Sequence, residues 1–281
     1  MTLRLLHKAM KKILAFLLVL LLPAMALADL EAHFLDVGQG DCAIIRCDGE
    51  YMVIDGGPKS ASNYVYSYIR SALETTRIDY VVSTHPHVDH VGGLATVLNA
   101  AQVDLLLTPV LEWDSEAFNS MIKYADMQGT VISVPEQGDT MQLGGATVTI
   151  LLCWPDAIEY GRTNDSSIVL RIDYGETSFL FTGDAEDWSE YMLIDEGVNL
   201  KADVLKVAHH GSIYSSTAEF LEEVSPEYAV ISAGKENKYG HPHEAVLDRL
   251  AAVGAKTLRT DEMGTIIIKS DGKSLRIVAG E

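Results

Sequence analysis

The stretch THPHVDHVGG, Thr84 to Gly93, places three imidazoles and one carboxylate within a few positions of one another. His85, His87, Asp89 and His90 stand at the offsets that a site for two metal ions requires. Asp89 and His90 come where the chain turns toward a helix, so they are directed at a second position next to the first pair. Neutral imidazole and carboxylate oxygen suit zinc best, and iron or manganese would also accept them.

The direction of the first two imidazoles follows from local rules. The short β-branched run before them, Val81 to Thr84, is typical of a buried strand. Pro86 biases His85 toward an extended backbone, and in an extended segment His85 and His87 point the same way. The sequence therefore predicts that these two side chains chelate one ion.

Three further strand ends carry side chains of the ligand type. Asp184 follows the apolar run of FLFTGDA, where a carboxylate could bridge two ions and take part in catalysis. DVLKVAHHGS ends in His209 and His210; we favour His210 as a ligand and His209 as a substrate contact, although strand alternation cannot decide between them. Asp55, at the end of YMVIDGG, is expected to orient a ligand imidazole.

In this order the motifs, together with FLDVGQGDCAII, NDSSIVLRI and YGHPH, resemble a metallo-β-lactamase-fold hydrolase. More narrowly, they are similar to the hydrolase domain of the ComEC-type competence proteins that act in DNA uptake. The resemblance runs from Leu30 to Val278 and implies an α/β fold, a four-layer αββα sandwich with the metal site at the sheet edges. It implies a first ion held by His85, His87 and Asp184, and a second held by Asp89, His90, Asp184 and His210.

One departure from the family pattern concerns the first ion. Many family members supply a third histidine between the HxHxDH motif and the bridging aspartate, but here no histidine follows His90 before Gly183. In that interval RTNDSS offers Asn164 or Asp165 as a weak oxygen ligand. The alternative is a plain loop with an Asx turn. In either case the first ion should be bound more weakly than the second.

Other polar residues near these motifs are candidates for supporting roles. The glycine-rich turn DVGQGD lacks the GKS/T ending of a phosphate loop, so we interpret it as a strand-to-strand turn that brings Asp41 near the site. Lys206 and Lys238 could contact a phosphodiester, and Ser212, just after the histidine pair, could contact a metal or the substrate.

The segment YGHPH adds two histidines close to the C-terminal helix. His241 precedes a proline and could bind a substrate phosphate or protonate a leaving group. His243 stands at a helix start, where a capping or surface position is an equally good interpretation.

The N-terminus has the features of a secretory signal peptide. A basic segment is followed by the apolar run Ile13 to Leu22 and by the small-x-small sequence Ala26-Leu27-Ala28. We expect cleavage after Ala28 and secretion of a hydrolase domain formed by residues 29–281; an uncleaved signal anchor is the alternative. No later segment approaches the roughly 20 apolar residues that cross a bilayer, so we carry over no transport role.

The charge of the chain argues against tight nucleic-acid binding. The net charge is −19. Removing residues 1–28 would take away four Lys/Arg and no acidic residue, which leaves 17 basic and 40 acidic side chains, or −23. Tight binding to nucleic acid relies on basic surface that displaces counterions.

The three cysteines do not suggest a disulfide framework. Cys42 and Cys47 are an odd number of residues apart on an expected strand, hence on opposite faces, and Cys153 is distant in sequence. Buried free thiols are therefore expected.

About 250 residues of alternating strand and helix patterns predict one large domain in two halves. The strands expected in the first half are Ala32 to Val37, Ala43 to Cys47, Met52 to Ile54, Tyr80 to Ser83 and Asp104 to Thr108. Those of the second half are Thr147 to Leu152, Ser167 to Ile172, Ser178 to Phe181, Asp203 to Val207, Tyr228 to Ile231 and Thr265 to Ile268. Helices are expected at Asn63 to Leu73, Ser115 to Met127, Asp187 to Glu196, Thr217 to Val224 and His243 to Ala252.

Together these patterns predict a secreted hydrolase that uses two divalent ions, zinc above manganese or iron, to cleave a phosphodiester. The substrate would be a small molecule or another phosphodiester, and the oligomeric state stays open. Because related folds open lactones, thioesters and lactams, a carbonyl-centred hydrolase is the first alternative. A non-catalytic envelope binding module is the second.

Overall fold

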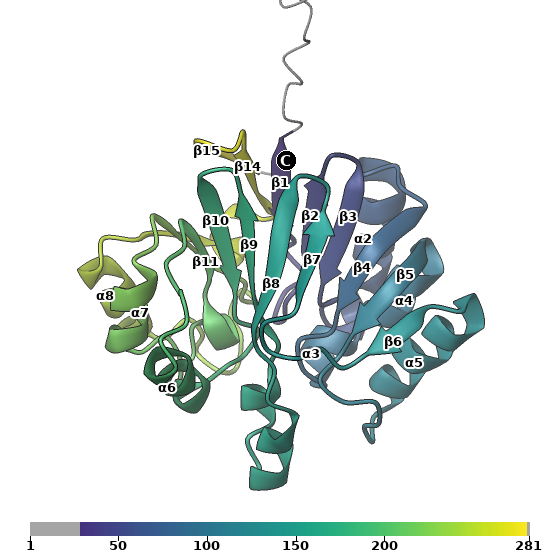
Figure 1. The fold of residues 1–281 in the computed structure, drawn as a ribbon, viewed down its shortest axis with the longest axis horizontal. Coiled ribbons are helices and arrows are strands. Elements are labelled where there is room, and N and C mark those ends of the chain that lie inside the picture. The colour runs from purple at the N-terminus through teal and green to yellow at the C-terminus, as the bar shows by residue number, and fades with distance from the viewer. Residues whose placement is uncertain (1–28, 280–281) are drawn as a thin grey trace, which may run out of the picture.

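Two β-sheets pack face to face, and helices cover the outer face of each sheet (Figure 1). The structure is a computed structural model that describes residues 29–279. It confirms the four-layer αββα sandwich expected from the sequence. The expected signal peptide, residues 1–28, lies outside the described residues.

The first sheet is formed mainly by the N-terminal half of the chain. Its strand order is β15 (Leu275–Ala279), β14 (Ile266–Ser270), β1 (Leu30–Phe34), β2 (Ala43–Cys47), β3 (Glu50–Ile54), β4 (Arg77–Val82), β5 (Gln102–Leu107) and β6 (Val131–Ser133). The pairs from β15 to β3 are antiparallel, and those from β3 to β6 are parallel.

The second sheet has the same division into antiparallel and parallel parts. Its order is β13 (Lys256–Arg259), β12 (Tyr228–Ile231), β11 (Val204–Lys206), β10 (Thr177–Phe181), β9 (Val169–Tyr174), β8 (Ala146–Leu152) and β7 (Thr140–Leu143). The pairs from β7 to β10 are antiparallel, and those from β10 to β13 are parallel.

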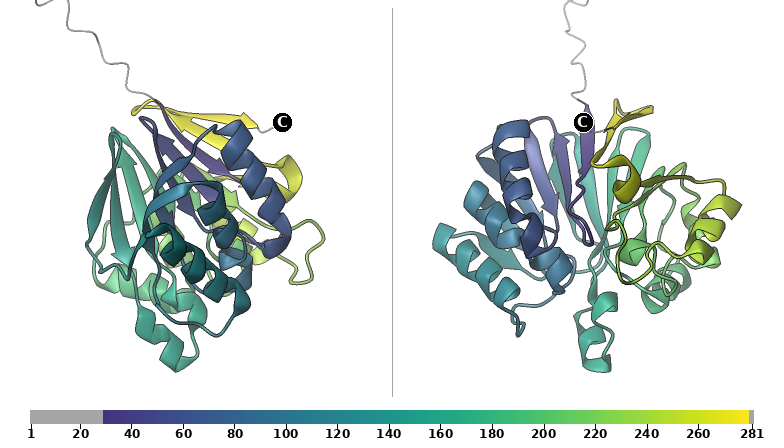
Figure 2. Two further views of the ribbon diagram at one scale, coloured as in Figure 1. Left: turned by 90° about the vertical axis from the view of Figure 1, so that its right-hand side faces the viewer. Right: turned by 180° about the vertical axis from the view of Figure 1, so that it is seen from behind.

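The helices fill the two outer layers (Figure 2). On the first sheet lie α2 (Ser62–Ser67), which continues as a π-helix over Tyr68–Ala72, α3 (Val88–Val91), α4 (Leu94–Ala100) and α5 (Glu116–Gln128). On the second lie α6 (Asp187–Asp195), α7 (Ala218–Val224) and α8 (Glu244–Ala252), while α9 (Thr260–Met263) connects β13 to β14. Among residues 29–279, no helix combines the length and the apolar character needed to cross a bilayer.

Strand alternation divides the apolar side chains among three packed layers. On β2, Ile45 points into the core between the sheets, whereas its neighbour Ile44 packs against the helices of the first sheet. Between the sheets Phe34 stacks on Phe181 with ring centroids 5.8 Å apart, and burying each such side chain contributes about 1.5–3 kcal/mol.

The cysteines follow the same alternation. Cys47 lies between the sheets and Cys42 in the layer under the helices, and all three cysteines are free thiols, as expected.

The parallel strands bring their carboxyl ends to one edge of the sandwich. In the first sheet the last residues of β3 and β4, Ile54 and Val82, are paired in register. In the second sheet β10, β11 and β12 end side by side. Loops that leave the carboxyl ends of parallel strands are where such folds bind ligands.

Strand pairing overturned one assignment of the sequence analysis. We placed Thr265 to Ile268 in the second half, but β14 pairs with β1 and so extends the first sheet. The chain crosses between the sheets after β13, a step that no local pattern encodes. The short strands β6, β7, β13 and β15 were not predicted, because partly exposed edge strands carry a weak hydrophobic pattern.

Candidate metal centre

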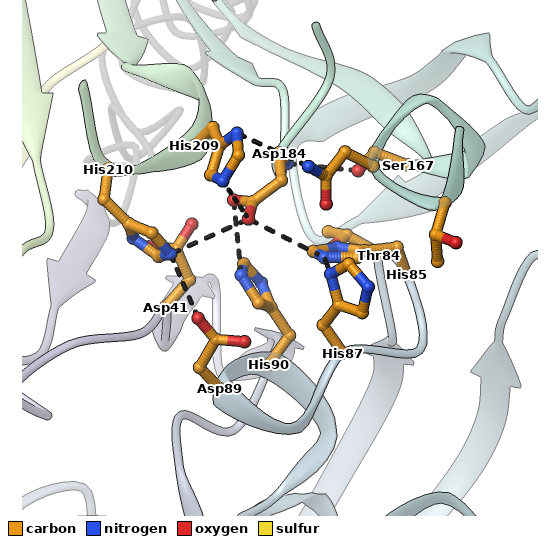
Figure 3. A network of polar contacts seen from close by, with 12 residues as sticks. Asp41, Thr84, His85, His87, Asp89, His90, Ser167, Asp184, His209 and His210 are labelled. Carbon is orange, nitrogen blue, oxygen red and sulfur yellow. Dashed lines mark hydrogen bonds and ion pairs between the residues drawn. The ribbon is translucent and has the colours of Figure 1, made fainter. Parts of the chain in front are cut away.

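The ligand-type side chains from both sheets meet around the carboxylate of Asp184 (Figure 3). Asp184 Oδ1 lies 3.2 Å from His90 Nε2, and its Oδ2 lies 3.7 Å from both His85 Nε2 and His210 Nε2. His209 Nε2 is 3.8 Å from the same Oδ2. All of these side chains come from the segments that follow the carboxyl ends of β4, β10 and β11: a loop and the helix α3 after β4, a turn after β10 and a short 3-10 turn after β11. Residues more than a hundred positions apart thus form one cluster.

Hydrogen bonds at the rear of two imidazoles fix which nitrogen faces the cluster. His210 Nδ1 lies 2.9 Å from the carbonyl oxygen of Ser232, which can only accept, so Nδ1 carries the proton and Nε2 presents its lone pair. His90 Nδ1 lies 2.7 Å from Asp55, which also accepts from the backbone and the hydroxyl of Thr84. The predicted orienting role of Asp55 agrees with these contacts.

The ring of His85 is fixed through Thr84. The Thr84 hydroxyl donates to Asp55 at 2.6 Å, so it can accept from His85 Nδ1 at 3.2 Å. His85 Nε2 is then left with a lone pair, 3.1 Å from His87 Nδ1. The His85 and His87 rings therefore lie next to each other, and the prediction that they share one ion stays a prediction.

The donor set fits divalent cations. In each of three groups of residues, the ligand atoms lie within 4.8 Å of one another. The groups share members: His85, His90 and Asp184; Asp89, His90 and His210; Asp41, Asp184 and His210. A fourth group joins Asp41, Asp55 and His90. His90 Nε2, His210 Nε2 and Asp184 Oδ1 are buried without a hydrogen-bond partner, although such atoms are ordinarily satisfied. Bound cations would satisfy all three. His87 and His209 line the pocket beside these groups but belong to none of them.

The backbone is strained where it delivers these ligands. His209 and His210 are consecutive residues in the left-handed region, with φ of 49° and 55°, and Asp55 has φ of 59°. For residues other than glycine each such conformation costs on the order of 1–3 kcal/mol and is concentrated at functional sites. The left-handed pair also explains why strand alternation could not decide between His209 and His210: neither lies on a strand.

The electrostatics favour an ionised carboxylate at the centre. Burial raises the pKa of Asp184, but the imidazoles of His90 and His210 outweigh burial and hold that pKa well below its usual value. Burial lowers the pKa of His90, yet the carboxylates of Asp184 and Asp55 raise it well above the usual value. The Asp184 carboxylate is therefore ionised and can act as a ligand oxygen.

The structure separates the two candidates for the missing ligand. The Asp165 carboxylate is fully buried and accepts from the backbone of Glu186 and Ser189, at the start of α6, and from Arg162 at 2.8 Å. Our suggestion that Asp165 faces an ion was therefore wrong, because both of its oxygens are engaged by the helix start and the guanidinium, and it does not line the pocket. Asn164 instead lines the pocket, and its Oδ1 is buried without a hydrogen-bond partner.

Lys206 and Ser212 are also placed differently from our suggestions. Lys206 is buried and forms an ion pair with Asp41 at 2.7 Å, so its ammonium cannot reach a substrate. Asp41 in turn lies 3.2 Å from His210 Nδ1, which puts it behind the ligand, as expected. Ser212 is buried outside the pocket lining, where its hydroxyl accepts from the backbone of Tyr214.

An open pocket of about 360 Å³ lies over the cluster. His209 contributes to its wall and is held by Glu186 at 3.2 Å. His241 also lines it, with its backbone tied to the side chain of Asn237. Burial and the nearby imidazoles of His210 and His209 lower the pKa of His241 to about 4. His243 is the residue just before α8, outside the pocket lining, and its ring accepts from the backbone of Ile213.

Several residues of the pocket region escaped the sequence analysis. Gln39 lies inside the DVGQGD turn and Glu186 two residues after Asp184, so proximity to those motifs could have identified them. Tyr239 also lines the pocket, and it is the first residue of the YGHPH segment, so it could have been identified in the same way. Trp113 lines the pocket from a loop with no motif of its own.

Comparison with known proteins agrees with this geometry. A family model described as the metallo-beta-lactamase superfamily matches residues 35–235. The chain is 32% identical over 253 residues to ComE operon protein 3 of Bacillus subtilis (strain 168), covering 84% of this chain and 32% of that protein. It is 32% identical over 232 residues to Competence protein ComA of Neisseria gonorrhoeae, covering 82% and 31%. The chain thus spans about a third of the length of these relatives.

A solved structure shows the same fold. The metallo-beta-lactamase fold protein YhfI from Bacillus subtilis superposes with a TM-score of 0.58 over 86% of this chain and 100% of that one, at 12% identity. The family match, the sandwich and the clustered histidines and aspartates agree with one another. The chain belongs to the metallo-beta-lactamase superfamily of metal-dependent hydrolases.

Proposed function

We propose that this protein is a secreted phosphodiesterase that uses two divalent ions, with zinc the first choice and manganese or iron as alternatives. One observation carries the proposal: ligand atoms from both sheets meet at Asp184, and several of them are buried without a hydrogen-bond partner. Because the ligand groups share His90, Asp184 and His210, they suit two adjacent ions better than one. Imidazole and carboxylate are ligands for each of the three metals.

In this proposal His85, His87 and Asp184 hold one ion, and Asp89, His90, Asp184 and His210 hold the other. Asn164 supplies the oxygen ligand of the first ion in place of a third histidine, through its unpartnered Oδ1. When bound, a pair of divalent ions activates a water molecule for attack and neutralises negative charge on the phosphoryl oxygens.

The side chains of the chain itself position the ions and the substrate. Asp55 and the Ser232 carbonyl hold the protons of His90 and His210 away from the pocket, so both rings present Nε2. His209 and His241 stand on the pocket wall, where their ring N–H groups can donate hydrogen bonds to phosphoryl oxygens. Glu186 keeps the His209 ring in place from behind.

The similarity to known proteins supports hydrolytic chemistry for this chain more than it supports a role in competence. Two of them are named for competence, but this chain corresponds to about a third of their length. We therefore propose shared hydrolytic chemistry and carry over no transport role. The extracytoplasmic location rests on the signal-peptide pattern of residues 1–28. N-terminal sequencing of the exported protein should begin at Asp29, and a mature protein that retains Met1 would refute cleavage.

The function is tested by metal analysis of the purified protein, followed by a parallel screen. The screen compares a bis-aryl phosphodiester with lactone, thioester and β-lactam substrates. We expect close to two equivalents of metal and turnover of the phosphodiester that chelation abolishes. Turnover of a carbonyl substrate alone would replace the proposal by a carbonyl-centred hydrolase, and bound metal without any turnover would favour a binding module.

A further inference from the structure

The pocket over the metal centre is lined by the ligand-type side chains and, on part of its wall, by apolar and aromatic groups. Its described lining includes Pro86, Val88, Trp113 and Tyr239, and it contains no Lys or Arg. Proteins that bind nucleic-acid strands use Lys and Arg to neutralise successive phosphates. Cations at the metal centre, with the His209 and His241 imidazoles, would serve the phosphate that reacts, but a second phosphate would meet no Lys or Arg within this lining.

The surface beyond Trp113 is acidic. Trp113 also lines a neighbouring open hollow of about 700 Å³, whose other lining residues are Leu111, Glu112, Asp114, Asn119 and Ile122. A strand that continued past Trp113 would bring its next phosphate toward Glu112 and Asp114. Like charges close together repel, and the net charge of −19 adds to that repulsion.

The basic side chains near the site are mostly engaged elsewhere. Arg162 pairs with Asp165 and Asp187, and Lys206 is buried against Asp41. Lys238 is exposed beside the pocket, with its ammonium 4.9 Å from the centroid of the Tyr239 ring. A single ammonium is enough for one charged group, but it does not form a track for a polyanion.

The two aromatic side chains of the pocket come from the two halves of the sandwich. Trp113 lies in the loop after β5, and Tyr239 lies in the loop after β12. Tyr239 is 53% exposed, and its ring stacks on His241 with centroids 5.6 Å apart and planes at 24°. Trp113 is half-buried, because it also packs against the core under the helices of the first sheet. An aromatic ring with part of its surface open to a pocket is a surface on which planar groups stack.

We propose that the substrate is a short phosphodiester with one negative charge and a planar aromatic group, which packs against Trp113 or Tyr239. A longer polyanionic strand is a poor substrate. This inference rests on the phosphodiesterase function proposed above and narrows its substrate class.

The first experiment compares a dinucleoside monophosphate with a twelve-nucleotide single strand of the same bases, using the metal-loaded full chain at rising salt. We expect kcat/KM for the strand to be at least about tenfold lower at low salt and to rise as salt screens the repulsion. A nuclease with a basic groove would show the opposite salt dependence. A strand that is the better substrate and loses kcat/KM with salt would overturn the inference.

The second experiment tests the two rings. Trp113→Ala and Tyr239→Ala should each raise KM for the dinucleoside monophosphate about tenfold with little change in kcat, and Trp113→Phe should retain most of the affinity. Tyr191→Ala is the matched control, because Tyr191 is also a surface tyrosine, 49% exposed, but lies on α6 in a separate hollow. It should leave KM unchanged.

Binding gives a readout that does not depend on turnover. The uncharged methylphosphonate analogue of the dinucleoside should bind the chelated protein, as followed by calorimetry, and its Kd should rise about tenfold in Trp113→Ala. Turnover and binding that are unaffected by either aromatic substitution would overturn this inference alone. Failure to cleave any phosphodiester would overturn the proposed function, and the inference with it.

Discussion

Replacing Lys206 with methionine should destabilise the fold far more than replacing an exposed lysine in an ion pair of similar length. The side chains of Lys206 and Asp41 are 4% and 7% exposed, and their charged atoms are 2.7 Å apart. Methionine is close to lysine in length and volume, so the substitution mainly removes the charge. Asp41 would be left buried with a carboxylate whose main stabilising charge is gone.

The magnitude follows from burial. Breaking a buried pair by removing one partner costs about 3–5 kcal/mol, whereas an exposed pair contributes about 0–1 kcal/mol. The matched control is Lys256→Met, because Lys256 pairs with Glu227 at 3.1 Å while the two side chains are 64% and 54% exposed. In a urea titration the Lys206→Met midpoint should fall by about 1–3 M, and the control midpoint should hardly move.

A double variant separates the lost charge from lost packing. Lys206→Met combined with Asp41→Asn removes both buried charges, and an asparagine oxygen can still accept from His210. The double variant should therefore be more stable than Lys206→Met alone. The urea curves are measured with and without chelator, so that metal binding does not mask the difference. The reasoning would be refuted if the urea midpoint of Lys206→Met equalled that of Lys256→Met. It would also be refuted if the losses of stability from Lys206→Met and Asp41→Asn simply added up in the double variant.

Four other outcomes follow from the site. Asp184→Asn should lower turnover by at least about two orders of magnitude, because the carboxylate shared by the ligand groups is lost; a near-normal rate with full metal content would exclude its central role. Asp55→Ala should weaken metal affinity roughly ten- to a hundredfold in a chelator titration, since His90 loses its partner, and an unchanged titration would contradict this. Chelation should remove the two ions in separate steps, and Asn164→His should close the gap by giving the weaker ion an imidazole; two equivalent ions in the parent would count against a ligand role for Asn164. Burial raises the pKa of Glu190 to about 7 from an ordinary 4.5, so the folded protein binds that proton more tightly than the unfolded chain does. This group's contribution to the free energy of unfolding is complete below pH about 4.5, and it decreases by up to about 1.4 kcal/mol per pH unit as the pH rises to about 7. In urea unfolding across this range, the free energy of unfolding of Glu190→Gln should fall less steeply with pH than that of the parent protein.

The sequence alone determined the features that depend on one short segment. Extended backbone around Pro86 made the direction of His85 and His87 predictable, because alternation acts over two residues. The same rule placed Cys42 and Cys47 on opposite faces. An apolar strand followed by a polar turn was enough to identify Asp55 and Asp184 as strand-end carboxylates.

Only the tertiary structure decided how distant segments compete for the same polar groups. Asp165 and Asn164 are neighbours in sequence, yet the start of α6 takes the carboxylate and leaves the amide to the pocket. Lys206 is buried because Asp41, from the other sheet, offers it a carboxylate. The membership of β14 in the first sheet is likewise set by hydrogen bonds to β1, which lies more than two hundred residues earlier. Local spacing determines the direction in which a side chain leaves its own segment. The partner that it meets depends on how the two sheets pack, and the sequence of a single segment does not contain that information.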